Sequence, residues 1–324
     1  AYRKMEDVEI VAVCDARLEA AQRLAQEFDI PRAYAEHGTM LAECQPDVVS
    51  VCVPYKFHHG ITLDALNAGA HVLCEKPPAM TVAEAQEMAD AAKTNERLLT
   101  YGFHMRYGEE VRLLKAKIDR GELGRIYAAE ARWLRRRGVP GWGVFTNKAV
   151  QGGGPLIDIG AHMLDAVAYL MDYPQVDYVC ADQFDAIIKQ GHSGLFGAWN
   201  PEACTVEDAV FGQIHFKDGR MLRLDASFAL NIRDKDVKEI KLYGDKMGAS
   251  VFPLELYASS DEECGNQTYP FLKDEDLHER EMFAFMDAVR GRAPLLVTAE
   301  QGVYVQRLIS LLYESAEAQR PVFA

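Results

Sequence analysis

The first third of the chain alternates short apolar runs with stretches of helical periodicity. The apolar runs are rich in β-branched residues, and the stretches between them repeat apolar positions every three or four residues. Thr81 followed by Glu84 is the pattern of a helix N-cap with a reciprocal hydrogen bond. Strands that alternate with helices in this way predict a parallel, doubly wound α/β sheet. Predicted strands cover residues 8–14, 48–53, 71–74 and 97–101, and predicted helices cover residues 18–28, 61–68 and 82–93.

Longer strands and fewer helices follow residue 124. Asp218-Gly219, between two of these strands, is a strong signal for a hairpin turn. The pattern predicts an α+β domain whose open sheet is mostly antiparallel. A chain of 324 residues has room for two domains, and we place them at residues 1–122 and 123–324. In the second domain, strands are expected at 126–132, 176–189, 205–216, 220–232 and 237–243, and helices at 156–171, 279–290 and 299–316.

Composition argues against several classes of partner. The formal net charge of −14 argues against nucleic acid, whose binding requires a basic face. No run of apolar residues is long enough to span a bilayer. Seven scattered cysteines, an odd number without metal-ligand spacing, favour a reducing compartment. We therefore expect a cytoplasmic protein without a nucleic-acid or membrane partner.

Asp15 ends the first predicted strand, and no glycine precedes it. In a dinucleotide-binding fold, an acid about 20 residues beyond a Gly-x-Gly-x-x-Gly turn ends the second strand and binds the ribose hydroxyls. We therefore expect the first strand and its glycine-rich turn to lie upstream of residue 1. The alternative is a Rossmann-like fold that lacks this turn. As a ribose ligand, Asp15 would repel a 2′-phosphate and so favour NAD over NADP, whereas Arg17 would soften that preference.

Two motifs are candidates for the chemistry. Glu75-Lys76-Pro77 follows a buried-looking strand and places Lys76 at the edge of a parallel sheet where ligands bind. Asp158 and His162, four residues apart at a helix start, share one face. The glycines at 152–154 would let the backbone approach a ligand closely. Taken alone, each motif also has a structural interpretation, namely a loop charge, a helix-start acid and a hydrogen-bonded core histidine.

Together and in this order, the motifs resemble the glucose–fructose oxidoreductase, inositol dehydrogenase and rhizopine-catabolism family. The resemblance runs from the first residues to about Leu312, and it is most specific at Glu75-Lys76-Pro77 and between Gly153 and His162. It implies a Rossmann-type NAD-binding domain at 1–122 and a domain for substrate binding and oligomerisation at 123–324. It also implies that Lys76, Asp158 and His162 form the catalytic group and bind the substrate.

The chemistry of these side chains agrees with the roles that the resemblance implies. Hydride transfer from a secondary alcohol requires removal of the hydroxyl proton, and a histidine that titrates near neutral pH suits the base. Asp158 would orient or polarise His162. Lys76 would stabilise the negative charge that develops on the substrate oxygen, and it would also lie near the cofactor.

The resemblance extends to two loops that differ from the family pattern. Residues 53–58 match a Thr-Pro-Asn-x-x-His turn with tyrosine in place of asparagine. Residues 101–106 match a Gly-Phe-Asn-x-Arg segment with His104 in place of asparagine. His58 is either a turn hydrogen-bonder or a cofactor neighbour, and His104 either lies near the nicotinamide and substrate or caps the next helix. The cofactor residues implied are Asp15, Arg17, Val53, Pro54, His58, Glu75, Lys76 and His104.

A basic run and a glycine–aromatic loop follow the first long strand of the second domain. Trp142 in this loop would present its ring to a sugar substrate. The arginines at 135–137 either meet an acidic or phosphorylated substrate or form a solvated strand end. The nine histidines show no His-Glu-x-x-His or similar spacing, so no catalytic metal is expected.

These observations predict an NAD-dependent oxidoreductase that acts on a secondary alcohol of a sugar, polyol or inositol. The expected assembly is a homodimer or homotetramer formed through the second sheet. Two alternatives stay open: a dinucleotide-binding sensor without turnover, and an enzyme that cleaves glycosides with redox assistance. Net production of NADH would separate the simple dehydrogenase from both.

Overall fold

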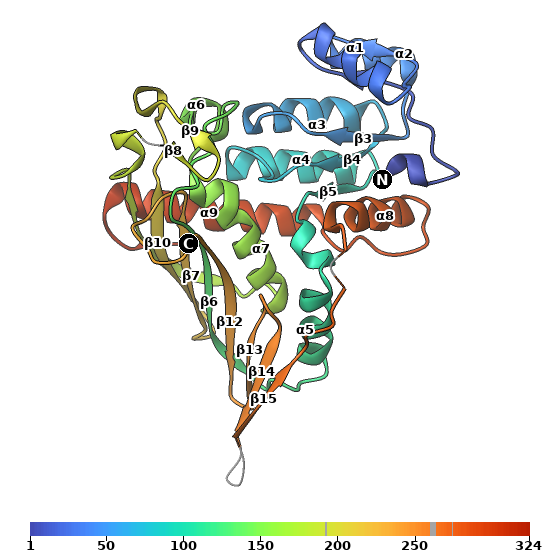
Figure 1. The fold of residues 1–324 in the computed structure, drawn as a ribbon. Helices are drawn as coiled ribbons and strands as arrows, with labels where there is room; N and C mark the ends of the chain where they lie inside the picture. Colours follow the sequence, from blue (N-terminus) through green and yellow to red (C-terminus); the bar gives the residue numbers. More distant parts are fainter. Residues whose placement is uncertain (192, 260–263, 274) are drawn as a thin grey trace.

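A computed structural model describes residues 1–191, 193–259, 264–273 and 275–324 of the chain. Helices and short parallel strands of the N-terminal part lie above a large sheet built from the C-terminal part (Figure 1). The predicted combination of a parallel Rossmann-type part with a mostly antiparallel sheet is confirmed. In the described part of the chain, no helix combines the length and apolar character needed to cross a bilayer.

The N-terminal part alternates strands and helices as the apolar pattern predicts. The capping box of Thr81 and Glu84 is present, because the Thr81 hydroxyl accepts from Glu84 N–H (3.2 Å) and the Glu84 carboxylate accepts from Thr81 N–H (3.0 Å). Helix α2 was not predicted. The elements are β1 (Val13–Cys14), α1 (Leu18–Glu27), β2 (Ala33–Tyr34), α2 (His37–Cys44), β3 (Val48–Val51), α3 (His58–Asn67), β4 (His71–Cys74), α4 (Val82–Thr94) and β5 (Leu99–Tyr101).

The parallel strands of this part form two separate sheets. β1 pairs with β2, and β3, β4 and β5 pair in that order, all in parallel. The strand predicted over 8–14 is therefore too long, since only its last two residues pair with a neighbouring strand. Val8 instead packs with Met5 beside Leu73 and Phe285, in a small hydrophobic cluster. The expected strand upstream of residue 1 stays a prediction.

The C-terminal part is built on a nine-stranded sheet in the order β15-β14-β13-β12-β6-β11-β10-β7-β16. All neighbouring pairs are antiparallel except β6 with β11. The predicted hairpin turn joins β10 to β11, with Gly219 at a φ of 84°. Its strands are β6 (Ile126–Arg135), β7 (Val176–Phe184), β10 (Ala209–Phe216), β11 (Met221–Ser227), β12 (Asp236–Gly244), β13 (Met247–Ser250), β14 (Glu255–Ser259), β15 (Cys264–Thr268) and β16 (Val322–Phe323).

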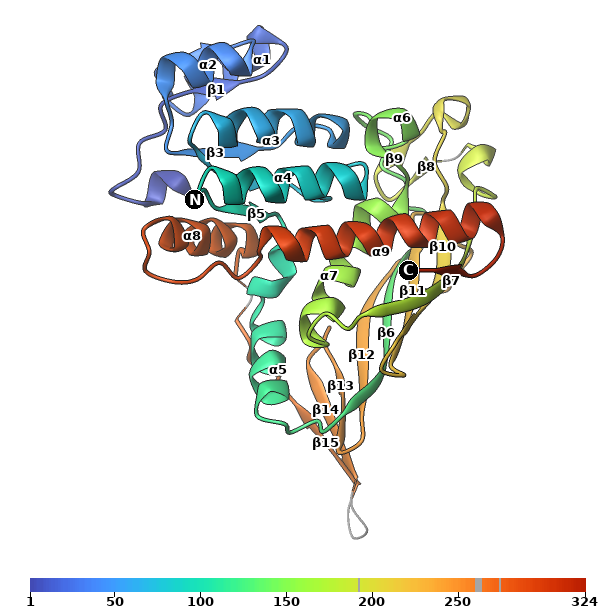
Figure 2. The same cartoon turned by 180° about the vertical axis from the view of Figure 1, so that it is seen from behind.

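The last two long helices return to the N-terminal part. α8 and α9 pass beside β5 and α4 in both views (Figures 1 and 2). The approach is close, because a Cβ at Gly302 of α9 would overlap the ring of Tyr101 at the end of β5. The two parts therefore share one packed interface. The remaining elements are α5 (Glu109–Asp119), α6 (Lys148–Gln151), α7 (Ala161–Leu170), β8 (Ser193–Gly194), β9 (Gly197–Ala198), α8 (Leu277–Val289) and α9 (Ala299–Ala318).

Candidate active site

Lys76 stands at the carboxyl end of β4 and reaches across to the C-terminal part. Its ammonium donates to a carboxylate oxygen of Asp158 (2.6 Å), to the Asp158 carbonyl (2.9 Å) and to the Tyr55 hydroxyl (3.2 Å). The Tyr55 hydroxyl in turn donates to the same Asp158 oxygen (3.0 Å). The Lys76 and Asp158 side chains are only 14% and 13% exposed. This charge-assisted network therefore joins the N-terminal and C-terminal parts of the chain at a position that is largely shielded from solvent.

The direct orientation of His162 by Asp158 is a prediction that the structure corrects. Residues Leu156–Gly160 form a π-helical turn before α7, so the spacing of four residues does not bring the two side chains together as in a regular α-helix. The Asp158 carboxylate is engaged by Lys76 and Tyr55 instead. In the described part of the chain, Nδ1 of His162 has no hydrogen-bond partner.

His162 lies in the first turn of α7 and is only 5% exposed. Its ring is 4.6 Å from that of His104 and 6.1 Å from that of Trp133, measured between centroids. Burial, and after it the nearby charge of Lys76, lower the pKa of His162 well below the ordinary histidine value. The imidazole is therefore neutral and available to accept a proton, but it is a weaker base than the histidine titrating near neutral pH that the sequence analysis expected.

A second buried pair anchors the helix that carries His162. Arg106 Nε donates to Asp165 (2.8 Å), and a second guanidinium nitrogen contacts the other carboxylate oxygen. Arg106 also donates to the Leu296 carbonyl (2.9 Å) and to Gln301 (2.6 Å). Because both members of the pair are fully buried, it fixes α7 relative to the segment that carries His104.

The glycines before Asp158 serve packing within the protein, which corrects the prediction that they admit a ligand. A Cβ at Gly153 would overlap the Tyr313 hydroxyl, and one at Gly154 would overlap the Glu207 carbonyl. The buried Glu207 carboxylate accepts from Gly154 N–H (2.9 Å) and from the Tyr313 hydroxyl (2.7 Å). The close approach therefore secures the loop that positions Asp158.

Asp15 and Arg17 follow β1, where the dinucleotide ribose is expected. The Asp15 carboxylate accepts from Arg17 N–H (2.8 Å) and is 44% exposed. The Arg17 guanidinium lies 3.8 Å from the same carboxylate and is 80% exposed. An accessible carboxylate at the end of a parallel strand fits a ribose diol, so these residues suit the adenosine end of NAD.

The other predicted cofactor residues lie in the loops that follow β3, β4 and β5. His58 is fully buried, and its ring nitrogens contact the carbonyls of Val53 (2.9 Å) and Pro77 (2.8 Å). These contacts give His58 the turn-bonding role and leave its ring no free nitrogen for a ligand. The Glu75 carboxylate accepts from Lys76 N–H (3.2 Å). The cofactor contacts of Val53, Pro54 and Glu75 stay predictions.

The arginine run is not uniformly solvated. Arg135 is packed over the rings of Trp133 (5.3 Å), Phe196 (5.1 Å) and Phe228 (6.0 Å), and its side chain is only 13% exposed. Trp142 is 52% exposed and stands edge-on to Phe196. Arg135 thus connects the aromatic loop with Trp133, which neighbours His162. Contact of Trp142 with a substrate ring stays a prediction.

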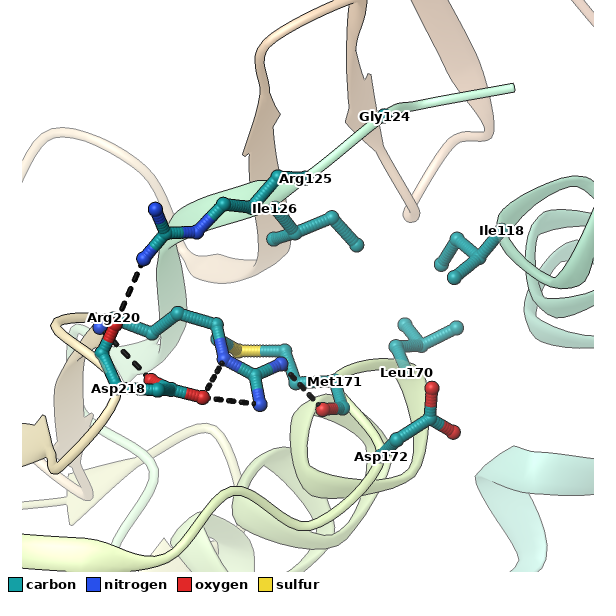
Figure 3. A pocket seen from close by; sticks show the side chains of 9 residues that line it. All are labelled: Ile118, Gly124, Arg125, Ile126, Leu170, Met171, Asp172, Asp218 and Arg220. Atoms are coloured by element: carbon teal, nitrogen blue, oxygen red, sulfur yellow. Dashed lines mark hydrogen bonds and ion pairs between the residues drawn. The ribbon is translucent and has the colours of Figure 1, made fainter. Parts of the chain in front are cut away.

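A separate pocket of about 320 Å³ lies at the start of β6, beside the β10–β11 turn (Figure 3). Its charges are already paired, because Arg125 donates to the Asp218 carbonyl (2.7 Å) and Arg220 donates to the Asp218 carboxylate (2.7 Å) and the Met171 carbonyl (2.6 Å). None of the candidate catalytic residues lines it. We assign no chemistry to this pocket.

Two residues of the site were missed by sequence reasoning. Tyr55 was noted only as a departure from the family turn, yet its hydroxyl bridges Lys76 and Asp158. His278 in the first turn of α8 places its ring 4.3 Å from that of His104. No local signal marks His278, because only the return of α8 to the N-terminal part brings it there.

Comparison with known protein families matches both parts of the chain. Residues 1–103 match a model described as an oxidoreductase family with an NAD-binding Rossmann fold. Residues 115–323 match the C-terminal alpha/beta domain of the same family. The chain belongs to this oxidoreductase family. The resemblance inferred from the motifs and the prediction of an NAD-dependent oxidoreductase are therefore confirmed.

Individual members of this oxidoreductase family resemble the whole chain. A D-glucoside 3-dehydrogenase of Escherichia coli is 46% identical, with 98% of this chain and 90% of the relative covered. A 1,5-anhydro-D-fructose reductase of Ensifer adhaerens is 27% identical, with 91% and 85% covered. A levoglucosan dehydrogenase solved with NADH has the same fold, with a TM-score of 0.84 at 22% identity and 97% and 89% covered.

Proposed function

We propose that this oxidoreductase oxidises the C-3 hydroxyl of a D-glucoside with NAD, forming a 3-keto product and NADH. The observation that supports it most is the 46% identity to a D-glucoside 3-dehydrogenase across 98% of the chain. The cluster of Lys76, Asp158 and His162 supports it independently, because it supplies a base and a cation at one point. NAD, when bound, accepts the hydride from the substrate carbon.

The residues of the chain handle the proton and the charge on oxygen. Neutral His162 takes the proton of the substrate hydroxyl. Lys76 stabilises the oxygen as negative charge develops, and the Asp158 carboxylate and carbonyl hold its ammonium in place. The Lys76–Tyr55 bond is the longest of the three at 3.2 Å, so a substrate oxygen would most easily take the place of Tyr55.

Net NADH production tests this function. Methyl D-glucoside with NAD should produce NADH, followed as its absorbance, whereas the 3-deoxy analogue should produce none and the 2-deoxy analogue should still react. NADH from the 3-deoxy analogue would contradict the C-3 assignment. Cleavage of the glycoside without net NADH would instead favour redox-assisted cleavage, and binding without any product would favour a sensor.

Cofactor preference should depend on Asp15. We expect kcat/KM to be higher with NAD than with NADP, because the accessible Asp15 carboxylate repels a 2′-phosphate. Asp15→Ala should shift the kcat/KM ratio toward NADP by about tenfold, equivalent to about 1.4 kcal/mol. Steady-state rates with both cofactors measure the shift.

Glu27→Ala is the matched control for this change. It removes the same charge from an exposed position at the far end of α1, and the cofactor ratio should stay unchanged. Equal use of both cofactors by the unaltered enzyme would contradict the role of Asp15.

Assembly through the C-terminal sheet is the remaining part of the proposal. Charged side chains form ion pairs on this sheet. Arg223 pairs with Asp225 (3.1 Å) within β11, and Arg132 of β6 pairs with Asp225 of β11 (3.6 Å) and with Glu239 of β12 (3.7 Å). Phe184 and Tyr127, on two of its strands, are about half exposed. Such a mixed polar and aromatic surface is compatible with a homodimer or homotetramer contact.

A further inference from the structure

Three histidines from three different elements form a continuous row. His162 belongs to α7, His104 to the 3-10 helix His104–Tyr107 after β5, and His278 to the first turn of α8. The ring centroids are 4.6 Å apart between His162 and His104 and 4.3 Å apart between His104 and His278. The row begins at His162, whose pKa is lowered by the charge of Lys76, and ends at His278 on α8.

Exposure to solvent increases along this row. His162 is buried, His104 is partly buried and His278 is exposed. Nδ1 of both His162 and His104 is buried and has no hydrogen-bond partner among the described residues. Buried polar atoms are almost always hydrogen-bonded, so these two ring nitrogens each have capacity for a further hydrogen bond. A water or a proton passing between the rings would satisfy both.

The charges around the row favour outward movement of a proton. Burial, and then His278, lower the pKa of His104 to about 3, and the ammonium groups of Lys76 and Lys238 act in the same direction. His162 is affected by the same charges. Asp276, which caps α8 and accepts from His278 N–H (3.0 Å), has the opposite effect on the pKa of His104. The lowered pKa values of His162 and His104 therefore disfavour a proton that stays on either ring. The Asp276 carboxylate, which caps α8, lies at the outer end of the row.

The proposed reaction requires such a path. Oxidation breaks the C–H and O–H bonds of the alcohol, forms the C=O bond, delivers the hydride to NAD and leaves one proton on the base. Since the base is buried, that proton has to reach water in every turnover.

We propose that the proton taken up by His162 leaves through His104 to His278 and from there passes to water. This inference rests on the proposed function and adds to it the route of the proton. His104 and His278 do not act on the substrate carbon in this route. They return His162 to its neutral form, and in the direction of reduction the same row supplies the proton.

Stopped-flow measurement of a single turnover tests the relay. A pH indicator in weak buffer reports proton release, and absorbance reports NADH in the same mixture. In the unaltered enzyme, both signals should rise together. In His278→Gln, NADH should form with little change in the binding of NAD or glucoside, while proton release should lag by about tenfold or more. That effect is smaller than the 10²–10⁴-fold expected for loss of the base itself.

Two further variants distinguish a relay from a structural role. In His278→Ala, added imidazole should restore proton release in proportion to its concentration, because a free base can occupy the exposed end of the row. His59→Gln removes a surface histidine bonded to Glu87 (2.7 Å) outside the row, and it should behave as the unaltered enzyme. Rescue by imidazole would not follow if His278 served only to pack α8.

The outcomes separate this inference from the proposed function. Proton release that keeps pace with NADH in His278→Gln would overturn the relay and leave the dehydrogenase intact, with Lys76 and Tyr55 as the remaining route. A lag that imidazole does not shorten would also overturn it. Failure of the unaltered enzyme to form NADH from any glucoside would refute the proposed function, and the relay with it.

Discussion

Replacement of His162 by alanine is expected to lower kcat by about 10²–10⁴-fold, the usual contribution of general base catalysis. The ring is buried and neutral, it is affected by the charge of Lys76, and its centroid lies 6.1 Å from that of Trp133. NAD affinity should change little, because His162 belongs to the C-terminal part. Steady-state kinetics with a glucoside and a separate titration with NAD measure the two effects.

A stacked histidine elsewhere in the fold supplies the control. His215 lies parallel to the ring of Tyr178 at 4.4 Å in the large sheet, so His215→Ala removes a packed imidazole that is not part of the His162–His104–His278 row. Its kcat should stay near that of the unaltered enzyme at equal fold stability. A His162→Ala variant that keeps nearly full activity would contradict the base assignment.

The pH dependence of His162 follows from the sign of its pKa shift. A base acts in its unprotonated form, and a lowered pKa keeps that form populated to lower pH. The acid limb of kcat/KM should therefore fall below the pH at which an ordinary histidine titrates. An acid limb at the ordinary histidine pKa would instead indicate an exposed base.

Replacement of Lys76 by methionine is expected to lower kcat/KM by about 10²–10³-fold, which corresponds to about 3–4 kcal/mol of transition-state stabilisation. The Lys76 ammonium bonds to both Asp158 and Tyr55. Fold stability should fall as well, because the change leaves a nearly buried Asp158 carboxylate without its cation. Kinetics and thermal unfolding of the same preparation measure both losses.

The loss of stability and the loss of activity can be separated with a second change. Lys76→Met combined with Asp158→Leu removes the unpaired charge, so the melting temperature should recover relative to Lys76→Met while activity stays low. Lys76→Met combined with His162→Ala should cost far less than the product of the two single losses, since the residues act as a unit. A double variant whose loss of activity equals the product of the two single losses would contradict a shared site.

The local sequence pattern was sufficient to predict those features of the structure that neighbouring residues determine. The alternation of apolar runs and helical periods predicted the parallel part, and Thr81 and Glu84 formed the expected capping box. Asp218-Gly219 formed the expected turn, since a positive φ at Gly219 is a local property. The motifs around Lys76 and His162 were sufficient to predict the family and the reaction class.

Contacts between distant segments could not be predicted in this way. The π-helical turn before α7 directs Asp158 to Lys76 and Tyr55, although the spacing of four residues suggested His162 as its partner. Gly153 and Gly154, which were expected to face a ligand, instead allow Tyr313 and Glu207 to approach closely from distant segments. The strand expected over residues 8–14 is shorter because β pairing requires a neighbouring strand, which no local pattern supplies.

The sequence by itself therefore determined the chemical groups and the elements that carry them. Hydrophobic periodicity and the residue preferences of turns are properties of a few consecutive residues, so they can be recognised without knowledge of the fold. The partners of Asp158, the burial of His162 and the row that ends at His278 were decided only by tertiary structure. The Lys76–Asp158 contact joins residues 82 positions apart. Burial and charge, which determine the pKa of His162, exist only once distant segments pack together.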